Sequence, residues 1–419
     1  MIATLALSLS LFTGLGDATP DTKLVDERRV LAGEGGDFQV TYWKLAGSNR
    51  AIGRRLAEVA QAEHGSSPAT PDARITTAQR SYFERYFPAH VDRMRGVADA
   101  FGLDFGDPEY NVSKLHFGFG RPGCTVAYFP PELCAEERGI VSRNFDFTTG
   151  TWNGRLPTEA GDERVCGRPY VMELRPDDGY ASIAVCAYDL LGGVVDGMNS
   201  EGLVVALLAD DEMRSRWALD GARGPQPGFD VIQVGRYLLE TCATADEARA
   251  ALTEAKLYWH QVPCHYLIAD AAGDSFIWEN AAALTHGHLI ERDAGQPLVS
   301  TNFMHHLHPE DELPEESHPK GSFNRHRTIC GRVAQADAPL TVDFVKGVAE
   351  SVAQDATAPA APFAPGRTLW HAIYVPSERR VEIDFYLGED PQGGVRRSGY
   401  RAFELRPSEQ PARTADFGR

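Results

Sequence analysis

A glycine-cysteine pair, Gly123-Cys124, stands where the chain passes from helical to strand-like residue spacing. Cutting the peptide bond between these two residues would give Cys124 a free α-amino group beside its own thiol. The pKa of an α-amine is about 7.7 to 8.0, so a useful fraction is neutral near pH 7 and can accept the thiol proton. One residue could then supply both a nucleophile and its base.

Two charged residues follow in the next strand-like segment, within the run Arg143-Asn144-Phe145-Asp146. A guanidinium near the thiol favours the thiolate, and a carboxylate could accept a hydrogen bond from the α-amine. Because side chains alternate along an extended strand, Arg143 and Asp146 should lie on opposite faces. Both can therefore reach Cys124 only through a bulge or at a strand end. The alternatives are a buried structural cysteine and an ion pair at the end of a strand.

The histidine run His305, His306 and His308 is a second candidate site. The HExxH spacing of zinc proteases is absent, and the run lies beside Pro309 in an acidic loop. A solvated loop is the favoured interpretation, and a metal-dependent hydrolase is the alternative. The chain also has no Gly-x-Ser-x-Gly elbow, so a serine enzyme of the α/β-hydrolase type has no local support.

Helical spacing precedes the cysteine, and strand spacing follows it. Apolar residues recur at helical intervals from Ile52 to Ala60 and from Val91 to Phe101, with loop-like residues 64–74 between them. The charged, Gly-rich residues 21–38 are expected to be a mobile lead-in to a first strand, Phe38–Leu45. Later strands are predicted at Ile140–Phe147, Tyr170–Leu174, Tyr180–Tyr188, Leu203–Leu208, His265–Ala269, Ser275–Glu279, Gly287–Glu291, Leu298–Thr301, Leu369–Val375, Arg380–Leu387 and Tyr400–Leu405. Helices are predicted at Phe229–Cys242, Ala245–Lys256 and Val342–Val352.

Blocks of strands separated by blocks of helices predict an α+β fold rather than the strand-helix alternation of a parallel sheet. Two packed antiparallel sheets covered by helices would fit this pattern.

Six segments, in chain order and at sensible distances, resemble a known family. They are Val40–Leu56 (VTYWKLAGSNRAIGRRL), Gly123-Cys124-Thr125, Arg143-Asn144-Phe145-Asp146, Gly197–Leu203 (GMNSEGL), Ser300-Thr301-Asn302 and Ser322-Phe323-Asn324-Arg325. They look like the first strand and helix, the self-cleavage site, the Arg-Asn-x-Asp motif, the Gly-x-Asn-x-x-Gly-Leu turn, the Thr-Asn element and the Ser-x-x-Arg element of one group of enzymes. These are the penicillin acyltransferase-like, autoproteolytic cysteine N-terminal nucleophile (Ntn) hydrolases, with the related choloylglycine hydrolases.

The resemblance implies a four-layer αββα sandwich and a role for each matching residue. It makes Cys124 the nucleophile and, through its amine, the base, with self-cleavage between Gly123 and Cys124. It also implies Arg143 beside the thiolate, Asp146 anchoring the α-amine, Asn302 donating to the oxyanion and Arg325 supporting the site. Asn199 is expected to be a structural turn residue near the site. We expect no metal and no cofactor.

The chain departs from the family pattern in three places. The 123 residues before Cys124 favour the penicillin acyltransferase-like branch, because choloylglycine hydrolases begin almost at their cysteine. Ala209 and Asp210 stand where those hydrolases carry a second oxyanion Asn or Tyr, so this donor must come from elsewhere, such as a backbone N–H. Phe303 stands where the acyltransferase-like family commonly has His.

Division of the chain at Cys124 follows from the resemblance. Residues 1–37 would be an N-terminal extension, 38–123 an α (pro) segment and 124–419 a β catalytic segment, with the last two folding together as one Ntn domain. Within the extension, Ile2–Gly16 is apolar but shorter than the about 20 residues of a membrane-spanning helix. It lacks the basic residues of a secretory signal, so a signal segment and an ordinary extension, and hence a secreted and a cytoplasmic location, both stay open.

The amino-acid composition of the chain narrows the classes of molecule that it could bind. Lys and Arg number 41 against 59 Asp and Glu, a formal charge of −18, and no basic region is apparent. Nucleic acid binding is therefore disfavoured, because it needs a basic face. The seven cysteines form no CxxC pair and are odd in number, which suits a mainly reduced chain.

We therefore expect a self-cleaving N-terminal-cysteine amidohydrolase or acyltransferase that acts on small-molecule linear amides or acyl thioesters through an acyl-cysteine intermediate. Its α and β fragments would stay together, with neither nucleic acid nor membrane as a partner. The alternative, which belongs to a different functional class, is an unprocessed binding protein of the same fold.

Overall fold

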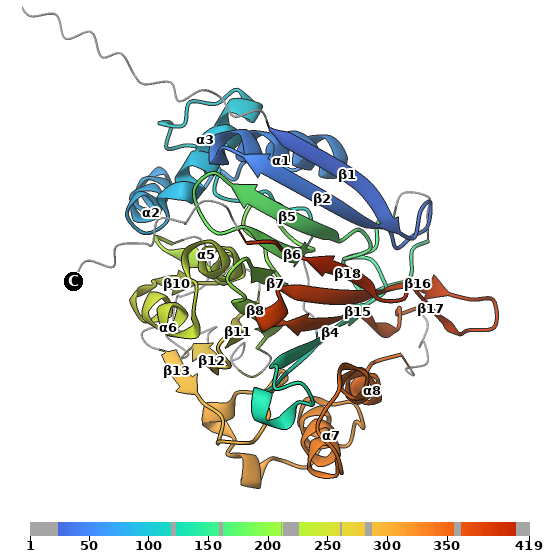
Figure 1. Ribbon diagram of the computed structural model, residues 1–419. Helices are drawn as coiled ribbons and strands as arrows, with labels where there is room; N and C mark the ends of the chain where they lie inside the picture. Colours follow the sequence, from blue (N-terminus) through green and yellow to red (C-terminus); the bar gives the residue numbers. More distant parts are fainter. Residues whose placement is uncertain are drawn as a thin grey trace, which may run out of the picture.

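The computed structural model describes residues 24–118, 123–158, 162–210, 212, 226–259, 262–280, 287–355 and 362–407 (Figure 1). The apolar N-terminal segment lies outside the described residues. In the part that is described, no helix is both long and apolar enough to cross a lipid bilayer. The seven cysteines are free thiols, and Cys330 is the most exposed of them.

The first sheet has nine strands within the described ranges and contains both early and central parts of the chain. Its strands pair antiparallel except β2 with β5, which run parallel. In spatial order they are β1 (Val25–Ala32), β2 (Val40–Gly47), β5 (Tyr170–Pro176), β6 (Ser182–Cys186), β7 (Asp196–Asn199), β8 (Val204–Ala209), β11 (Cys264–Ala269), β12 (Ser275–Asn280) and β13 (Gly287–Ile290).

The second sheet brings the strand that begins at the Gly123-Cys124 pair next to strands from the C-terminal part of the chain. The order is β14 (Leu298–Ser300), β3 (Gly123–Phe129), β4 (Ile140–Thr148), β15 (Gly366–Val375), β16 (Arg380–Glu389) and β17 (Val395–Arg397), and β18 (Arg401–Glu404) also pairs with β16. A separate parallel pair joins β9 (Phe229–Asp230) to β10 (Leu257–Tyr258).

Helices cover the outer face of each sheet (Figure 1). The first sheet is covered by α1 (Asn49–His64), α2 (Ala73–Tyr86), α3 (Pro88–Phe101), α5 (Val234–Thr241) and α6 (Ala245–Glu254). The second is covered by α7 (Ser322–Ala334) and α8 (Val342–Val352). Short 3-10 turns include Pro131–Leu133, Val231–Gln233, His305–Leu307, Glu310–Glu312 and Pro376–Glu378.

Three apolar cores separate the four layers, because alternate residues of each strand face opposite sides. Trp43 and Met172 pack under the first helical layer. Their neighbours Tyr42 and Val171 face the second sheet, where Phe145 belongs to the same core. Ala127 packs against α7 and α8 on the far side. The expected αββα sandwich is confirmed, with one parallel strand pair in a sheet expected to be antiparallel.

The prediction that residues 21–38 are a mobile lead-in is wrong for the part that forms strand β1. Val25–Ala32 pairs along β2, and its side chains are mostly exposed because it is the outer strand of the sheet. A strand exposed on both faces shows no apolar alternation, so its sequence looks like a charged linker.

Several helices and strand bounds also differ from expectation. Helix α2 begins at Ala73, inside the segment predicted to be a loop, where the Asp72 side chain caps the first turn. Helix α7 and strand β17 were not predicted. The helix predicted over Phe229–Cys242 begins only at Val234, because a short strand and a 3-10 turn occupy its first part.

Candidate active site

Cys124 is the second residue of β3 and is completely buried. The antiparallel register places Gly123 opposite Asp146 and Cys124 opposite Phe145. Cys124 and Phe145 belong to the core between the two sheets. The thiol therefore lies inside the sandwich, while Asp146 lies on the other face of the same sheet.

Arg143 approaches the thiol from within the inter-sheet core. Its Nη2 atom lies 3.1 Å from Cys124 Sγ and 2.9 Å from the carbonyl oxygen of Leu207, which belongs to the first sheet. Burial raises the pKa of the Cys124 thiol, although the Arg143 charge and a hydrogen bond from the Ala209 N–H oppose the shift. Ionising this buried thiol near neutral pH therefore calls for a base.

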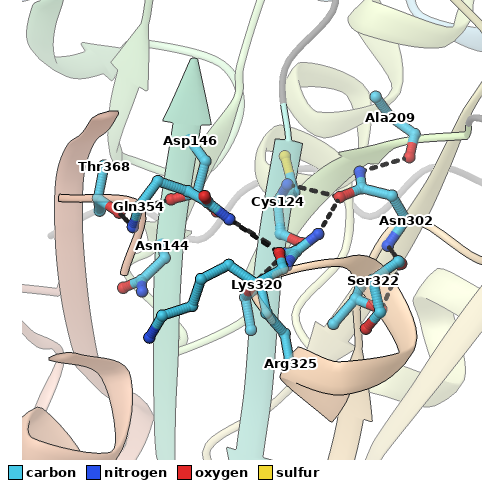
Figure 2. A network of polar contacts seen from close by, with 12 residues as sticks. Cys124, Asn144, Asp146, Ala209, Asn302, Lys320, Ser322, Arg325, Gln354 and Thr368 are labelled. Atoms are coloured by element: carbon cyan, nitrogen blue, oxygen red, sulfur yellow. Dashed lines mark hydrogen bonds and ion pairs between the residues drawn. The ribbon is translucent and has the colours of Figure 1, made fainter. Parts of the chain in front are cut away.

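The backbone nitrogen of Cys124 has a defined acceptor on the opposite side from Asp146 (Figure 2). Its N–H donates to Asn302 Oδ1 over 2.8 Å. The same oxygen accepts from Arg325 Nη2 at 2.8 Å, and Asn302 Nδ2 donates to the Ala209 carbonyl at 2.8 Å. Since a guanidinium only donates, this network orients the Asn302 amide with its oxygen toward the Gly123–Cys124 peptide.

Arg325 connects the remaining groups of this network. Besides Asn302, it donates to the carbonyl oxygen of Cys124 and to the hydroxyl of Thr125. Its Nη1 atom lies 3.7 Å from Asp146 Oδ2. Arg325 comes from the first turn of α7, and Ser322 of the same turn accepts a hydrogen bond from the Asn302 N–H.

Asp146 lies at the strand end that brings it close to the peptide preceding Cys124. Thr368 of β15 donates to Asp146 Oδ1 at 2.6 Å, where an irregularity in the β4–β15 register lies between Thr368 and Trp370. Burial raises the pKa of Asp146, while Arg325 and the Thr368 hydroxyl oppose the shift. Arg143 and Asp146 therefore flank Cys124 from opposite faces of the sheet, and the β3–β4 register itself contains no bulge.

Asn199 has a structural set of partners in the turn between β7 and β8. Its Oδ1 accepts from the N–H groups of Glu201 and Leu203, and its Nδ2 donates to two carbonyls at the end of α5. Gly202 in the same turn has φ +89°, a conformation that residues with a Cβ adopt only under strain. None of the hydrogen bonds described for Asn199 reaches Cys124.

Asp196 is a site residue that the sequence prediction missed. This fully buried carboxylate lies 3.5 Å from Arg143 Nε and accepts hydrogen bonds from Trp370 and Tyr374 of the second sheet. Burial raises its pKa, and Arg143 opposes that shift. One signal was available, because an aspartate in an apolar strand next to the GMN turn is costly to bury without a partner.

The histidine run is arranged differently from a metal centre. His306 Nδ1 lies 2.7 Å from Glu279, and His308 Nε2 lies 2.6 Å from Glu212. Across the described ranges, no group of three or more His, Cys, Asp or Glu side chains is placed to hold a metal ion.

A cavity of about 1050 Å³ opens at the same end of the sandwich as Cys124. Strand β3 begins there, and β4 and β6 end there, at Thr148 and Cys186. The lining includes Phe117, Trp152, Leu156, Cys166 and Ala187, together with Arg155 and Arg168. Tyr188 follows Ala187, and its ring lies 6.3 Å from that of Phe145, the strand partner of Cys124.

Fold and site define a class of enzyme: hydrolases and acyltransferases of the Ntn type that act on amides. The family model described as acyl-coenzyme A:6-aminopenicillanic acid acyl-transferase matches residues 134–390, more than half of the chain. The chain belongs to this family. The match begins after Cys124, so it does not include the cysteine itself.

Solved structures with a similar fold are distant in sequence. A mutant of the conjugated bile acid hydrolase from Clostridium perfringens is 12% identical with a TM-score of 0.45, covering 68% of this chain and 97% of that one. Penicillin V acylase from Agrobacterium tumefaciens is 16% identical with a TM-score of 0.36 over 63% and 83% of the two chains. A Caenorhabditis elegans ortholog of N-acylethanolamine-hydrolyzing acid amidase is 14% identical with a TM-score of 0.37 over 61% and 93%. Similarities this distant carry no conclusion about the reaction. No curated protein matches the sequence.

Replacing Asp196 with asparagine should leave the buried Arg143 guanidinium opposite a neutral group of nearly the same shape. Breaking a buried ion pair in this way costs on the order of 3 kcal/mol. We expect urea unfolding of Asp196→Asn to show a loss of that size. The control Asp99→Asn weakens a half-exposed pair with Arg50 and should cost at most about 1 kcal/mol. Equal losses in the two variants would contradict this account of Asp196.

Proposed function

We propose that this chain is a self-cleaving amidohydrolase or acyltransferase whose nucleophile is the N-terminal cysteine formed at Cys124. The observation that carries the proposal is the surroundings of this one residue. A guanidinium contacts its thiol, an amide oxygen accepts from its backbone nitrogen, and a carboxylate stands opposite the preceding glycine. This is the set of groups that an aminothiol nucleophile requires.

In the proposed self-cleavage, Cys124 Sγ attacks the carbonyl carbon of Gly123. The C–N bond breaks, a C–S thioester forms, and the thiol proton goes to the departing amine. Water then hydrolyses the thioester, leaving a carboxylate on Gly123 and a free thiol and α-amine on Cys124. Asn302 Oδ1 supports this step, because it already accepts from the nitrogen that becomes the amine.

In the proposed catalytic cycle, the new α-amine accepts the thiol proton and the thiolate attacks the acyl carbon of an amide or thioester. The ordinary pKa of an α-amine is close to neutral, so the amine near Asn302 and Asp146 can accept a proton. Burial raises the pKa of the Cys124 thiol, which therefore needs such a base. Arg143 supports the thiolate as it forms. Water or an amine then takes the acyl group from the cysteine.

The oxyanion formed in each step needs hydrogen-bond donors. The backbone N–H of Ala209 lies close enough to the Cys124 thiol to oppose the rise in its pKa, and we propose it as the backbone donor that replaces the missing side chain at this position. Asn302 Nδ2 is the second proposed donor. Losing one donor of this kind typically lowers the rate about 10²- to 10³-fold.

We propose that the substrate binds in the cavity at the open end of the sandwich. Its size suits a small molecule, and its wall combines apolar side chains with arginines and with acidic side chains. The family description names an acyl-coenzyme A, which is a thioester, and 6-aminopenicillanic acid, and substrates of these two kinds would suit a wall of this mixed character.

Self-cleavage should be visible by intact mass. Purified wild-type protein should give two fragments, one ending at Gly123 and one beginning at Cys124, whereas Cys124→Ala should give one full-length species. The control Cys134→Ala removes another buried thiol and should cleave as wild type does. A full-length wild-type chain would exclude the proposal and favour an unprocessed binding protein, whereas a cleaved Cys124→Ala chain would exclude Cys124 as the nucleophile of self-cleavage.

The two roles proposed for Asn302 can be separated with two substitutions. Asn302→Asp keeps the oxygen that faces Cys124 and Arg325 but loses the Nδ2 donor, whereas Asn302→Ala loses both. We expect the Asp variant to self-cleave within about tenfold of wild type and the Ala variant to be far slower. Both should lose about 10²- to 10³-fold in turnover of N-acyl p-nitroanilides. Self-cleavage is measured by time-resolved intact mass. An Asn302→Ala variant that self-cleaves at the wild-type rate would rule out the acceptor role of Asn302.

A further inference from the structure

Two polar side chains of the first sheet cross the inter-sheet space close to Asn302. His265 lies on β11 and Glu279 on β12, and both are completely buried. The register pairs Tyr266 with Trp278, so His265 and Glu279 are cross-strand neighbours. They lie on the same face as Leu267 and Ile277, which belong to the inter-sheet core.

His265 contacts the chain immediately before Asn302. Its Nε2 atom lies 2.9 Å from the carbonyl oxygen of Thr301 and 3.0 Å from Ser300 Oγ. A carbonyl oxygen can only accept, so Nε2 carries a proton and donates to it. This contact joins the first sheet to the peptide that precedes Asn302.

Glu279 contacts the chain soon after Asn302. Its Oε1 accepts from the His305 N–H at 2.6 Å, and its Oε2 accepts from the His306 N–H at 3.0 Å and faces His306 Nδ1 at 2.7 Å. Burial alone would raise the pKa of Glu279, but the hydrogen bond from His306 and the neighbouring histidines His265 and His305 lower it. Glu279 is therefore suited to hold two backbone N–H groups as an ionised acceptor.

We propose that His265 and Glu279 are positioning residues that fix Asn302 from both sides and so aim its amide at Cys124. The inference rests on the proposed function of the site. The contact from α7, Ser322 Oγ to the Asn302 N–H, fixes Asn302 from the second sheet's helical layer. The Asn302 side chain already donates to the Ala209 carbonyl of the first sheet, and His265 and Glu279 add contacts from the same sheet to the backbone on either side of Asn302.

This polar link differs from the rest of the inter-sheet space, which is mainly apolar. Burying a histidine and a carboxylate there is costly unless each is hydrogen-bonded, and apolar residues of similar size would fill the same volume. His288 stacks on His306 at 3.9 Å between ring centroids, which helps to hold the ring that faces Glu279.

A matched pair of substitutions tests the role of His265. His265→Leu keeps the bulk but removes the donor to Thr301, and His265→Gln can restore an N–H at nearly the same place. We follow self-cleavage by intact mass during cell-free synthesis and check folding by thermal unfolding. We expect folded His265→Leu to self-cleave at least tenfold more slowly than wild type and His265→Gln to recover to within about threefold.

Glu279→Gln provides the second test and decides the question should His265→Leu fail to fold. The amide nitrogen that replaces one carboxylate oxygen can only donate, so the glutamine cannot accept from the His305 and His306 N–H groups with two separate oxygens. We again expect at least tenfold slower self-cleavage in a folded protein. Wild-type cleavage in the folded variants, or no recovery in His265→Gln, overturns the inference. Failure of the proposed function is distinct, because wild-type protein would then remain uncut or Cys124→Ala would be cut.

Discussion

The buried guanidinium of Arg143 is the interaction on which the arrangement of the site depends. A buried cation between two sheets is tolerated only when its N–H groups have hydrogen-bond acceptors and its charge has an anionic partner. Here these partners come from both sheets. Leu207 and Asp196 belong to the first sheet, while the thiol of Cys124 belongs to the second. The two sheets must therefore keep one relative position for this cation to be satisfied.

Other polar groups near Cys124 reinforce the same constraint. Asn302, two residues after the end of β14, donates to Ala209 of the first sheet, and Trp370 of the second sheet donates to Asp196. Several polar links between the sheets thus gather around Cys124, in an inter-sheet space that is otherwise mainly apolar. Such links demand defined geometry, so the groups around the thiol are held in place before any substrate binds.

The sequence predicted the parts of this arrangement that have local signals. Period-two runs indicated most strands, and the segments around Cys124, Arg143 and Asn302 suggested the site that the second sheet and α7 bring together. Strand β1 escaped prediction because an outer strand exposed on both faces has no alternation. The parallel pairing of β2 with β5 has no local signal either, because it joins segments more than a hundred residues apart.

The missed site residues have a common physical reason. Asp196, Thr368, His265 and Glu279 act through contacts made across sheets or strands, and their neighbours in sequence are ordinary strand residues. A buried charge in an apolar strand would have drawn attention to Asp196 and Glu279, although not to their partners. The odd offset between Arg143 and Asp146 was explained only by the register, which puts Asp146 opposite Gly123 at the strand end.

The central claim is that one residue carries a thiol and an α-amine side by side. 2-Cyanobenzothiazole condenses with N-terminal cysteines, which present both groups, and so tests this claim directly. After unfolding of the purified protein in urea, peptide mapping should locate the stable adduct on Cys124 and on none of the other six cysteines. An acyl-transferring preparation in which Cys124 carries no such adduct would contradict the account.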